Sequence, residues 1–432
     1  MNEPIVFDGP EISMKKDCVN IAGVEHRHWH NTYGMYMQRA TAEGLELPRK
    51  GNAGIGDRRG GGGDGRPFVL SRSFFAGSQR WGAIWMGDNA AKWEHLVAST
   101  PMLLSISLAG LPFVGADVGG YFGDPSPELF LRWMQAAAYQ PFFRSHAHHD
   151  SKRREPWVFG DPWTERIRSA VMARYTLLPY WRVYTVFQEA NESGMPMMRP
   201  MWVQYPEDIK TFDMDDQWMV GRDLLVKPVV TEGATSVDVY FPGATSTTAS
   251  SLWFDVDTAV AVTGVGAHRP VDAPVDKIPV YQRGGSIIPR KQRLRRSSRL
   301  MAADPYTLVI ALDERGTAEG KLYLDDGESY NYRKSDGSGK TTRRFAFLEG
   351  VLSGRAVEGS GGYRVPNTIE RVVIYGLQKE PSSVTIANPA SGPDERALEF
   401  AYDARVGTMT VRKPDVCVVD DFDLRIRDAT TY

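Results

Sequence analysis

The sequence is poor in three features that would each indicate a class of protein. Its 432 residues include two cysteines, Cys18 and Cys417, which lie far apart and form neither a disulfide framework nor a metal-binding pair. It has no run of about 18 apolar residues, so it predicts no membrane-spanning segment. Its net charge is -2, so no bulk field favours nucleic acid or a membrane surface. What remains is an ordinary globular composition, 42% hydrophobic and 24% charged, long enough for two or three domains.

The N-terminus lacks the features of a signal peptide. Residues 1–7 (Met-Asn-Glu-Pro-Ile-Val-Phe) contain neither a basic region nor a sufficiently long apolar stretch. They also do not have the pattern of a domain start. We therefore expect no signal peptide in this chain.

Glycine is concentrated in residues 45–65, which include a run of four glycines. The spacing Gly54-x-Gly56 resembles part of a nucleotide-binding loop, but no strand pattern precedes it. The composition is typical of a flexible, solvated insert. We interpret the segment as a linker and expect no nucleotide cofactor.

Strand and helix patterns alternate between residues 66 and 145, which indicates parallel βαβ units. The helical patterns cover residues 92–108 and 125–138. The strand patterns cover residues 66–75, 82–88, 111–120 and 140–145.

Each of these strand patterns ends close to one polar side chain. The four side chains are Arg72, Asp88, Asp117 and His146. Barrel enzymes keep their reacting groups at the carboxyl ends of parallel strands, so we expect these side chains to meet at one mouth. Trp85 lies three residues before Asp88 and would form an apolar wall beside it. The alternative for Asp88 alone is that it caps the helix that follows.

From residue 195 onward the pattern changes to short alternating runs between turn signals, which predicts an all-β region of two small sandwiches. A long helical pattern before it ends at Gly194. The join between the sandwiches lies near the basic run 290–299, which we interpret as a solvated connector rather than a polyanion site. The expected division is therefore residues 1–194, 195–290 and 291–432.

Several motifs occur in the order found in glycoside hydrolase family 31, which this sequence resembles over nearly its whole length. They are Met1–Pro4, Arg72, Trp85–Asn89, Gly115–Gly120 and Phe142–His146, with longer stretches around residues 74–80, 138–144, 198–206 and 278–285. The resemblance implies an α/β plus all-β fold: the C-terminal half of a (β/α)8 barrel followed by two small β-sandwich domains. It also implies a retaining α-glucosidase that uses no cofactor and no metal.

The resemblance assigns roles residue by residue. Asp88 matches the general acid/base. Five further residues match groups around the bound glucose, the first two as holders of its hydroxyls: Arg72, His146, Trp85, Asp117 and Tyr121. Retaining enzymes of this kind use two carboxyl groups about 5 Å apart, one as the acid/base and one as the nucleophile.

The family nucleophile is an aspartate directly before a Met-Asn-Glu-Pro motif, and this sequence begins at the methionine of that motif. We therefore expect the chain to be the C-terminal part of a longer enzyme, without the nucleophile and inactive by itself. The branch of the family that it resembles most works in the lumen of the endoplasmic reticulum. Such enzymes trim α-1,3-linked glucose from N-glycans and pair with a non-catalytic β subunit.

Two alternatives remain open. A non-catalytic, carbohydrate-binding pseudoenzyme would also lack the nucleophile, but it would have no need to keep Asp88, Arg72 and His146. A zinc-dependent barrel hydrolase would use the histidines of residues 146–150 or 25–30, with carboxylates from other strands. Arg72 at the same mouth would repel a cation, which argues against zinc.

Overall fold

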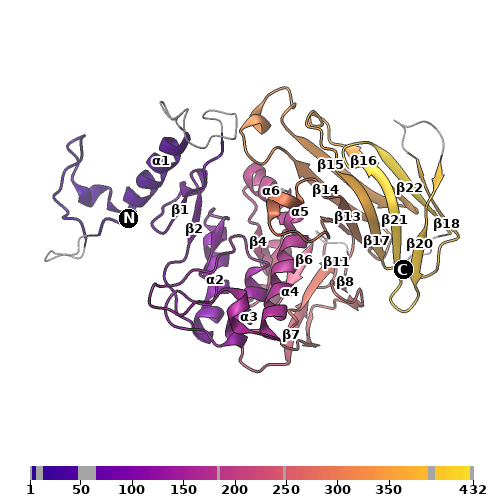
Figure 1. The fold of residues 1–432 in the computed structure, drawn as a ribbon, viewed down its shortest axis with the longest axis horizontal. Coiled ribbons are helices and arrows are strands. Elements are labelled where there is room, and N and C mark those ends of the chain that lie inside the picture. The colour runs from indigo at the N-terminus through magenta and orange to yellow at the C-terminus, as the bar shows by residue number, and fades with distance from the viewer. Residues whose placement is uncertain are drawn as a thin grey trace.

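The computed structural model describes residues 2–5, 13–46, 65–181, 185–246, 250–387 and 395–428. Helices and a small parallel sheet make up the first half, and mainly antiparallel sheets make up the second (Figure 1). The segment before α1 (Tyr33–Glu46) extends away from the rest of the molecule, whereas α1 packs against the parallel sheet, where Gln38 donates to Ala83 O (Figure 1). Most of the segment 45–65 lies outside the described residues, so its flexibility stays a prediction. None of the described helices is long and apolar enough to cross a bilayer.

The parallel sheet has the order β1-β2-β3 and very short strands. The expected strand 66–75 is regular over two residues only, and 140–145 contributes one parallel bridge, between Asp117 and Arg144. Each of these two ranges has a proline at its second position, which has no N–H for a ladder. The elements of this part are β1 (Leu70–Ser71), β2 (Ala83–Trp85), α2 (Trp93–Leu108), β3 (Val114–Gly115), α3 (Pro127–Ala137), α4 (Trp163–Thr176), α5 (Leu178–Trp181) and α6 (Thr185–Ser193).

α3 begins where the sequence supplies a helix start. The Ser126 side chain accepts a hydrogen bond from the Leu129 N–H at 3.2 Å, Pro127 is the first helical residue and Glu128 lies in the first turn. These residues satisfy free N–H groups and complement the helix dipole. Residues 129–137 are all buried, so α3 is a core helix.

A buried arginine on α3 joins this helical part to the antiparallel sheets. Arg132 is 1% exposed, and burial lowers its pKa. Such a charge is tolerated inside a protein only when hydrogen-bond acceptors surround it. The guanidinium donates to four backbone carbonyls, those of Ala234 and Ala273 at 3.0 Å, Lys277 at 2.9 Å and Pro274 at 3.2 Å.

The next part consists of a six-stranded sheet, β4-β5-β6-β11-β8-β9, and a two-stranded sheet, β10-β7. Trp218 and Val220 of the larger sheet belong to the core shared with the helices, whereas Met219 between them packs toward Phe241 of the smaller sheet. Successive strand residues point to opposite faces, so the larger sheet is buried on both sides. The elements are β4 (Met198–Pro200), α7 (Met201–Gln204), β5 (Trp218–Val220), β6 (Leu224–Val226), β7 (Ser236–Phe241), β8 (Leu252–Asp255), β9 (Ala261–Thr263), β10 (Ala267–Asp272) and β11 (Val280–Arg283).

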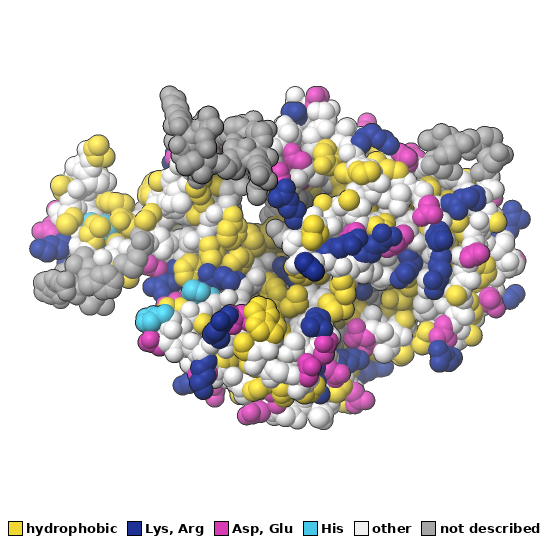
Figure 2. Space-filling view, viewed as in Figure 1, with side chains coloured by type: hydrophobic (Ala, Val, Ile, Leu, Met, Phe, Trp, Pro, Cys, Tyr) yellow, Lys and Arg dark blue, Asp and Glu magenta, His cyan; other side chains and the backbone are white. Residues whose placement is uncertain are grey.

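The last sheet has eleven strands and curls around its own core (Figure 1). The sheet changes between β11 and β12, and the domain limits at 194/195 and 290/291 stay a prediction. In the view of Figure 2, acidic and basic side chains lie interspersed over this sheet. The sheet order is β19-β18-β22-β16-β15-β14-β12-β13-β17-β21-β20. The strands are β12 (Ser286–Arg290), β13 (Tyr306–Ala311), β14 (Ala318–Leu324), β15 (Thr341–Leu348), β16 (Val351–Ala356), β17 (Thr368–Tyr375), β18 (Ser383–Ala387), β19 (Arg396–Ala397), β20 (Phe400–Asp403), β21 (Thr408–Cys417) and β22 (Phe422–Arg427).

The basic run 290–299 is not simply a solvated connector. Lys291 is 4% exposed, and its ammonium donates to the Met301 and Ala302 carbonyls, both at 2.9 Å. Burial lowers the pKa of Lys291 to about 8. The interpretation of this run as solvated is wrong for Lys291, because its ammonium is buried and bonded to backbone carbonyls rather than to water.

Candidate active site

Asp88 and Arg72 follow neighbouring parallel strands and form an ion pair. β2 ends at Trp85, and Gly87 has φ +83°, a left-handed conformation that lets the chain leave the sheet. Arg72 Nη1 donates to Asp88 Oδ2 at 3.1 Å, and the two side chains are 36% and 30% exposed. Asp88 does not cap the next helix, because α2 begins at Trp93 and has no side-chain cap.

The segment of residues 2–5 lies against the end of β1 and adds a second carboxylate. Glu3 Oε1 accepts from Arg72 Nε at 2.6 Å, so one guanidinium joins Glu3 and Asp88. The hydrogen bond to Glu3 raises the pKa of Arg72. With its amide turned to suit its neighbours, Asn2 accepts from the backbone N–H groups of Arg72 and Ser73 at 3.0 and 3.1 Å. These bonds fix the direction in which Arg72 points.

Asp117, which follows β3, is buried and paired with Arg144. Asp117 is 1% exposed, and its Oδ1 accepts from Arg144 Nη2 at 2.6 Å. Burial raises the pKa of Asp117, and the Arg144 guanidinium opposes that rise. The same guanidinium lies over the ring of Trp85, 5.1 Å from the ring centroid. Arg144 therefore joins Asp117 to the wall beside Asp88.

Three buried polar atoms of this group have no hydrogen-bond partner within the described part of the chain. They are Asp117 Oδ2, Trp85 Nε1 and Arg144 Nε. Leaving a buried donor or acceptor unpaired costs about 1–3 kcal/mol. One acceptor and two donors together suit a ligand that carries several hydroxyl groups, because each hydroxyl both donates and accepts.

His146 and Tyr121 complete the group from the loops beyond the sheet. Their ring centroids are 5.0 Å apart. His146 lowers the pKa of Asp117 and Asp88 raises it, so both lie near that carboxyl group. The structure thus brings together all six site residues expected from the sequence. We call the assembled group the mouth cluster: Glu3, Arg72, Trp85, Asp88, Asp117, Tyr121, Arg144 and His146.

Two buried arginines hold the loops that carry this cluster. Arg174, on α4, donates to three backbone carbonyls of residues 138–141 at 2.6–3.1 Å, just before Arg144. Arg154 donates to three carbonyls of residues 119–123, around Tyr121. Gly120 in that loop has φ +84°, and a Cβ there would lie 2.2 Å from Ala91 N, so only glycine fits.

Two members of the mouth cluster, Glu3 and Arg144, received no role from the sequence. Arg144 lies two residues before His146, and in an extended segment such side chains point to the same side. This spacing was the signal that could have identified Arg144. For Glu3 the only signal was its position in the Met1–Pro4 motif.

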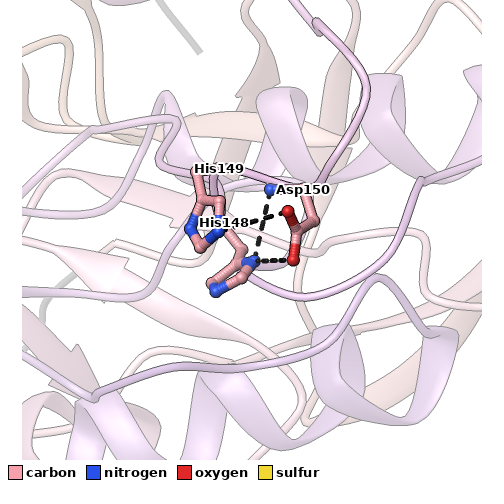
Figure 3. A group of neighbouring side chains, drawn as sticks. All are labelled: His148, His149 and Asp150. Atoms are coloured by element: carbon pink, nitrogen blue, oxygen red, sulfur yellow. Dashed lines mark hydrogen bonds and ion pairs between the residues drawn. The ribbon is translucent and has the colours of Figure 1, made fainter.

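The groups that could hold a metal lie outside the mouth cluster. Asp88 and Asp117 each pair with an arginine, which opposes a cation between them. Among the described residues, one set of three metal-ligating side chains lies close enough to share an ion: His148, His149 and Asp150 (Figure 3). The zinc hydrolase alternative, with Asp88 as a ligand, therefore gains no support.

A cavity of about 590 Å³ lies apart from the mouth cluster, between α6 and the loops that follow β14. Its lining includes Arg66, Phe187, Tyr323 and Tyr332. No member of the mouth cluster lines this cavity. The candidate site therefore rests on the chemistry and proximity of its side chains.

Family models match most of the chain. Residues 1–185 match the model for "Glycosyl hydrolases family 31 TIM-barrel domain", and residues 194–288 match that for "Glycosyl hydrolase family 31 C-terminal domain". The chain is similar to neutral alpha-glucosidase AB of Dictyostelium discoideum, with 48% identity over 429 residues, which are 99% of this chain and 43% of that protein.

Two solved structures also resemble the chain. One is the glucosidase II alpha subunit in its alpha3-Glc2-bound form, with TM-score 0.88 and 39% identity over 99% of this chain and 45% of that one. The other is the heterodimeric complex of ER glucosidase II, consisting of the catalytic subunit and the binding domain of the regulatory subunit, with TM-score 0.88 and 40% identity over the same shares. The chain spans less than half the length of these proteins. The expected fold class, part of an α/β barrel followed by β domains, is confirmed.

Proposed function

We propose, from the premise that this chain belongs to glycosyl hydrolase family 31, that the mouth cluster binds the terminal glucose of an α-glucoside and hydrolyses its bond with retention. The observation that carries the proposal is the convergence of Arg72, Asp88, Asp117 and His146 at one end of the parallel sheet. Carbohydrate hydrolysis needs a carboxyl group beside polar groups that hold hydroxyls, and this cluster supplies both.

Asp88 acts as the general acid/base. It donates its proton to the glycosidic oxygen as the C1–O bond breaks, while a nucleophilic carboxylate bonds to C1 from the opposite face. Asp88, now ionised, takes a proton from the water that attacks C1 and frees the nucleophile. Arg72, 3.1 Å away, stabilises the ionised Asp88 between these steps. Glu3, on the other side of the guanidinium, keeps Arg72 in place.

The remaining members of the mouth cluster bind the sugar. Asp117 and Arg144 offer an unpaired carboxylate oxygen and an unpaired N–H, and Trp85 offers its indole N–H beside an apolar ring. His146 and Tyr121 lie together, and His146 is near the Asp117 carboxyl group. Arg72 and His146 hold hydroxyls, as the family resemblance assigns them.

The natural substrate is an N-glycan that ends in α-1,3-linked glucose, the compartment is the lumen of the endoplasmic reticulum, and the partner is the glucosidase II β subunit. The alpha3-Glc2-bound and regulatory-subunit-bound structures to which this chain is similar support these assignments. Since no described carboxylate of the cluster takes the nucleophile's role by resemblance, a polypeptide of these 432 residues alone should show negligible hydrolysis. General acid catalysis by itself contributes only about 10²–10⁴-fold.

The stereochemistry of the released sugar tests the proposal. Full-length protein is mixed with an α-1,3-linked glucose disaccharide, and the first product is followed by proton NMR before mutarotation. A retaining enzyme releases α-glucose first, and β-glucose as the first product would overturn the mechanism. Glucoside binding without any hydrolysis would favour the carbohydrate-binding pseudoenzyme instead. The 432-residue polypeptide, assayed beside it, should release no glucose above background.

A further inference from the structure

The loop that follows His146 places three metal-ligating side chains in consecutive positions. In Figure 3 the side chains of His148, His149 and Asp150 gather at one side of this loop. His148 Nδ1 lies 3.5 Å from Asp150 Oδ2, and His149 Nε2 lies 3.2 Å from Asp150 Oδ1. One donor atom from each residue lies within 4.8 Å of the others.

These separations suit a small tetrahedral ion. Zinc binds imidazole nitrogen and carboxylate oxygen at about 2.0–2.2 Å, so neighbouring ligand atoms of a tetrahedron lie about 3.4 Å apart. The distance from His148 to Asp150 Oδ2 and the distance from His149 to Asp150 Oδ1 fall on either side of that value, so each imidazole lies at ligand spacing from one of the two carboxylate oxygens. Two imidazoles and one carboxylate favour zinc over calcium or magnesium, which prefer oxygen ligands only.

The loop is held in shape without an ion. The His148 N–H donates to Tyr121 O at 2.9 Å, and the Ser151 N–H donates to His148 O at 3.0 Å. The Lys152 N–H donates to Asp124 Oδ1 at 2.8 Å. His148 Nδ1 accepts from the Asp150 N–H at 3.3 Å, and an ion bound at Nδ1 would replace this long hydrogen bond. Little ordering of the backbone is therefore needed before an ion can bind.

The cations that follow in the sequence are neutralised elsewhere. Arg153 pairs with Glu155 at 2.6 Å, and Lys152 lies 4.0 Å from Asp124. Arg154 is occupied by backbone carbonyls. None of these three side chains is paired with the Asp150 carboxylate, which stays available to an ion.

We propose that His148, His149 and Asp150 bind one zinc ion on the rim of the candidate active site, with water in the fourth position. The sequence predicted no metal, and the geometry of this turn revises that prediction for the rim alone. The ion binds neither Asp88 nor Asp117, so its role is structural: it joins His148, His149 and Asp150 on a loop that is already ordered, and it does not activate water. The site is independent of the proposed glucosidase activity.

Zinc binding to the full-length protein tests this proposal. After dialysis against a chelator, the protein is titrated with zinc chloride in a calorimeter, and His149→Leu and Asp150→Asn are titrated in parallel. Because His149 and Asp150 are about four-fifths exposed, these variants should fold as the parent does. His268→Leu, which removes another exposed histidine, is the matched control.

We expect one zinc equivalent in the parent and in His268→Leu, and a loss of affinity of about tenfold or more in both loop variants. Cobalt loaded in place of zinc should give the intense visible bands of a tetrahedral site, which His149→Leu should abolish. Unchanged zinc affinity in both loop variants would overturn the proposal. So would loss of the zinc equivalent in His26→Leu alone, since His26 Nε2 and His30 Nδ1 also lie 2.6 Å apart.

Discussion

The parallel part and the eleven-stranded sheet use their strands for different purposes. β1 and β3 have two residues each, whereas β21 has ten. The short strands deliver Arg72, Asp88 and Asp117 to one mouth, where three buried polar atoms of the cluster have no partner among the described residues. The long strands enclose a core of apolar side chains. The unsatisfied polar groups of the mouth cluster therefore depend on stability supplied elsewhere in the chain.

Replacing Asp88 gives the largest expected effect, and it should be confined to activity. Asp88→Asn in the full-length protein should lower kcat for an α-linked disaccharide by about 10²–10⁴-fold, because the leaving oxygen loses its proton donor. An aryl glucoside with an acidic leaving group should lose much less in the first, bond-breaking step. The melting temperature should not fall. Equal losses for both substrates would argue against the acid role.

A substitution in the core of the eleven-stranded sheet should have the opposite effect, lowering stability and leaving activity unchanged. Phe345, on β15, is fully buried, and its ring centroid lies 6.3 Å from the ring centroid of Phe422. Phe345→Ala should lower the free energy of unfolding by about 3–5 kcal/mol while the folded enzyme keeps its kcat. Leu348→Ala, at a 57% exposed position of the same strand, is the control and should change little. A fall in kcat at temperatures where the variant is folded would show that the core of the eleven-stranded sheet affects activity as well as stability, contrary to the comparison.

The pair of Arg144 and Asp117 is part of the mouth cluster, and its carboxylate is buried. Breaking the pair should therefore lower both folding stability and sugar binding. Arg144→Met leaves a buried carboxylate unpaired, which we expect to destabilise the protein by about 3 kcal/mol and to weaken sugar binding. Without Arg144 the pKa of Asp117, already raised by burial, rises further. The deficit should therefore be largest near neutral pH and shrink as the pH falls below that raised pKa. Thermal unfolding across pH measures this, and Asp117→Asn in the same variant should restore part of the loss.

The smallest effect concerns Lys291, whose pKa is about 8 in the folded protein against an ordinary 10.5. Between these values the unfolded chain binds more protons, so the contribution of Lys291 to stability rises with pH. Relative to Lys291→Met, the wild type should gain about 1–2 kcal/mol from pH 8 to pH 9.5. The stability of the control variant Lys321→Met, which replaces an exposed lysine, should change with pH as that of the wild type does. A difference in unfolding free energy between wild type and Lys291→Met that does not change from pH 8 to pH 9.5 would contradict this prediction.

The sequence was sufficient for the order of elements in the parallel part and for placing six residues in one group, whose roles stay a prediction. Alternating strands and helices predicted the parallel part, and the polar residue after each strand predicted the mouth. It was not sufficient for strand length, because residues 140–145 contribute only one isolated parallel bridge among the described residues, between Asp117 and Arg144. It also could not identify Arg132, Arg154 and Arg174 as buried, since an arginine that holds backbone carbonyls has no distinguishing neighbours in sequence. The burial of Lys291 could not be predicted for the same reason.

The anchoring of Arg132 has a consequence for how such chains can be recombined. A cut at residues 194/195 would leave its guanidinium uncovered in one piece and strip four carbonyls of their donor in the other. A graft of the barrel segment onto a foreign sheet would need acceptors at the same four places. The two parts should therefore have been inherited together, as one unit of exchange, although family models divide the chain between them.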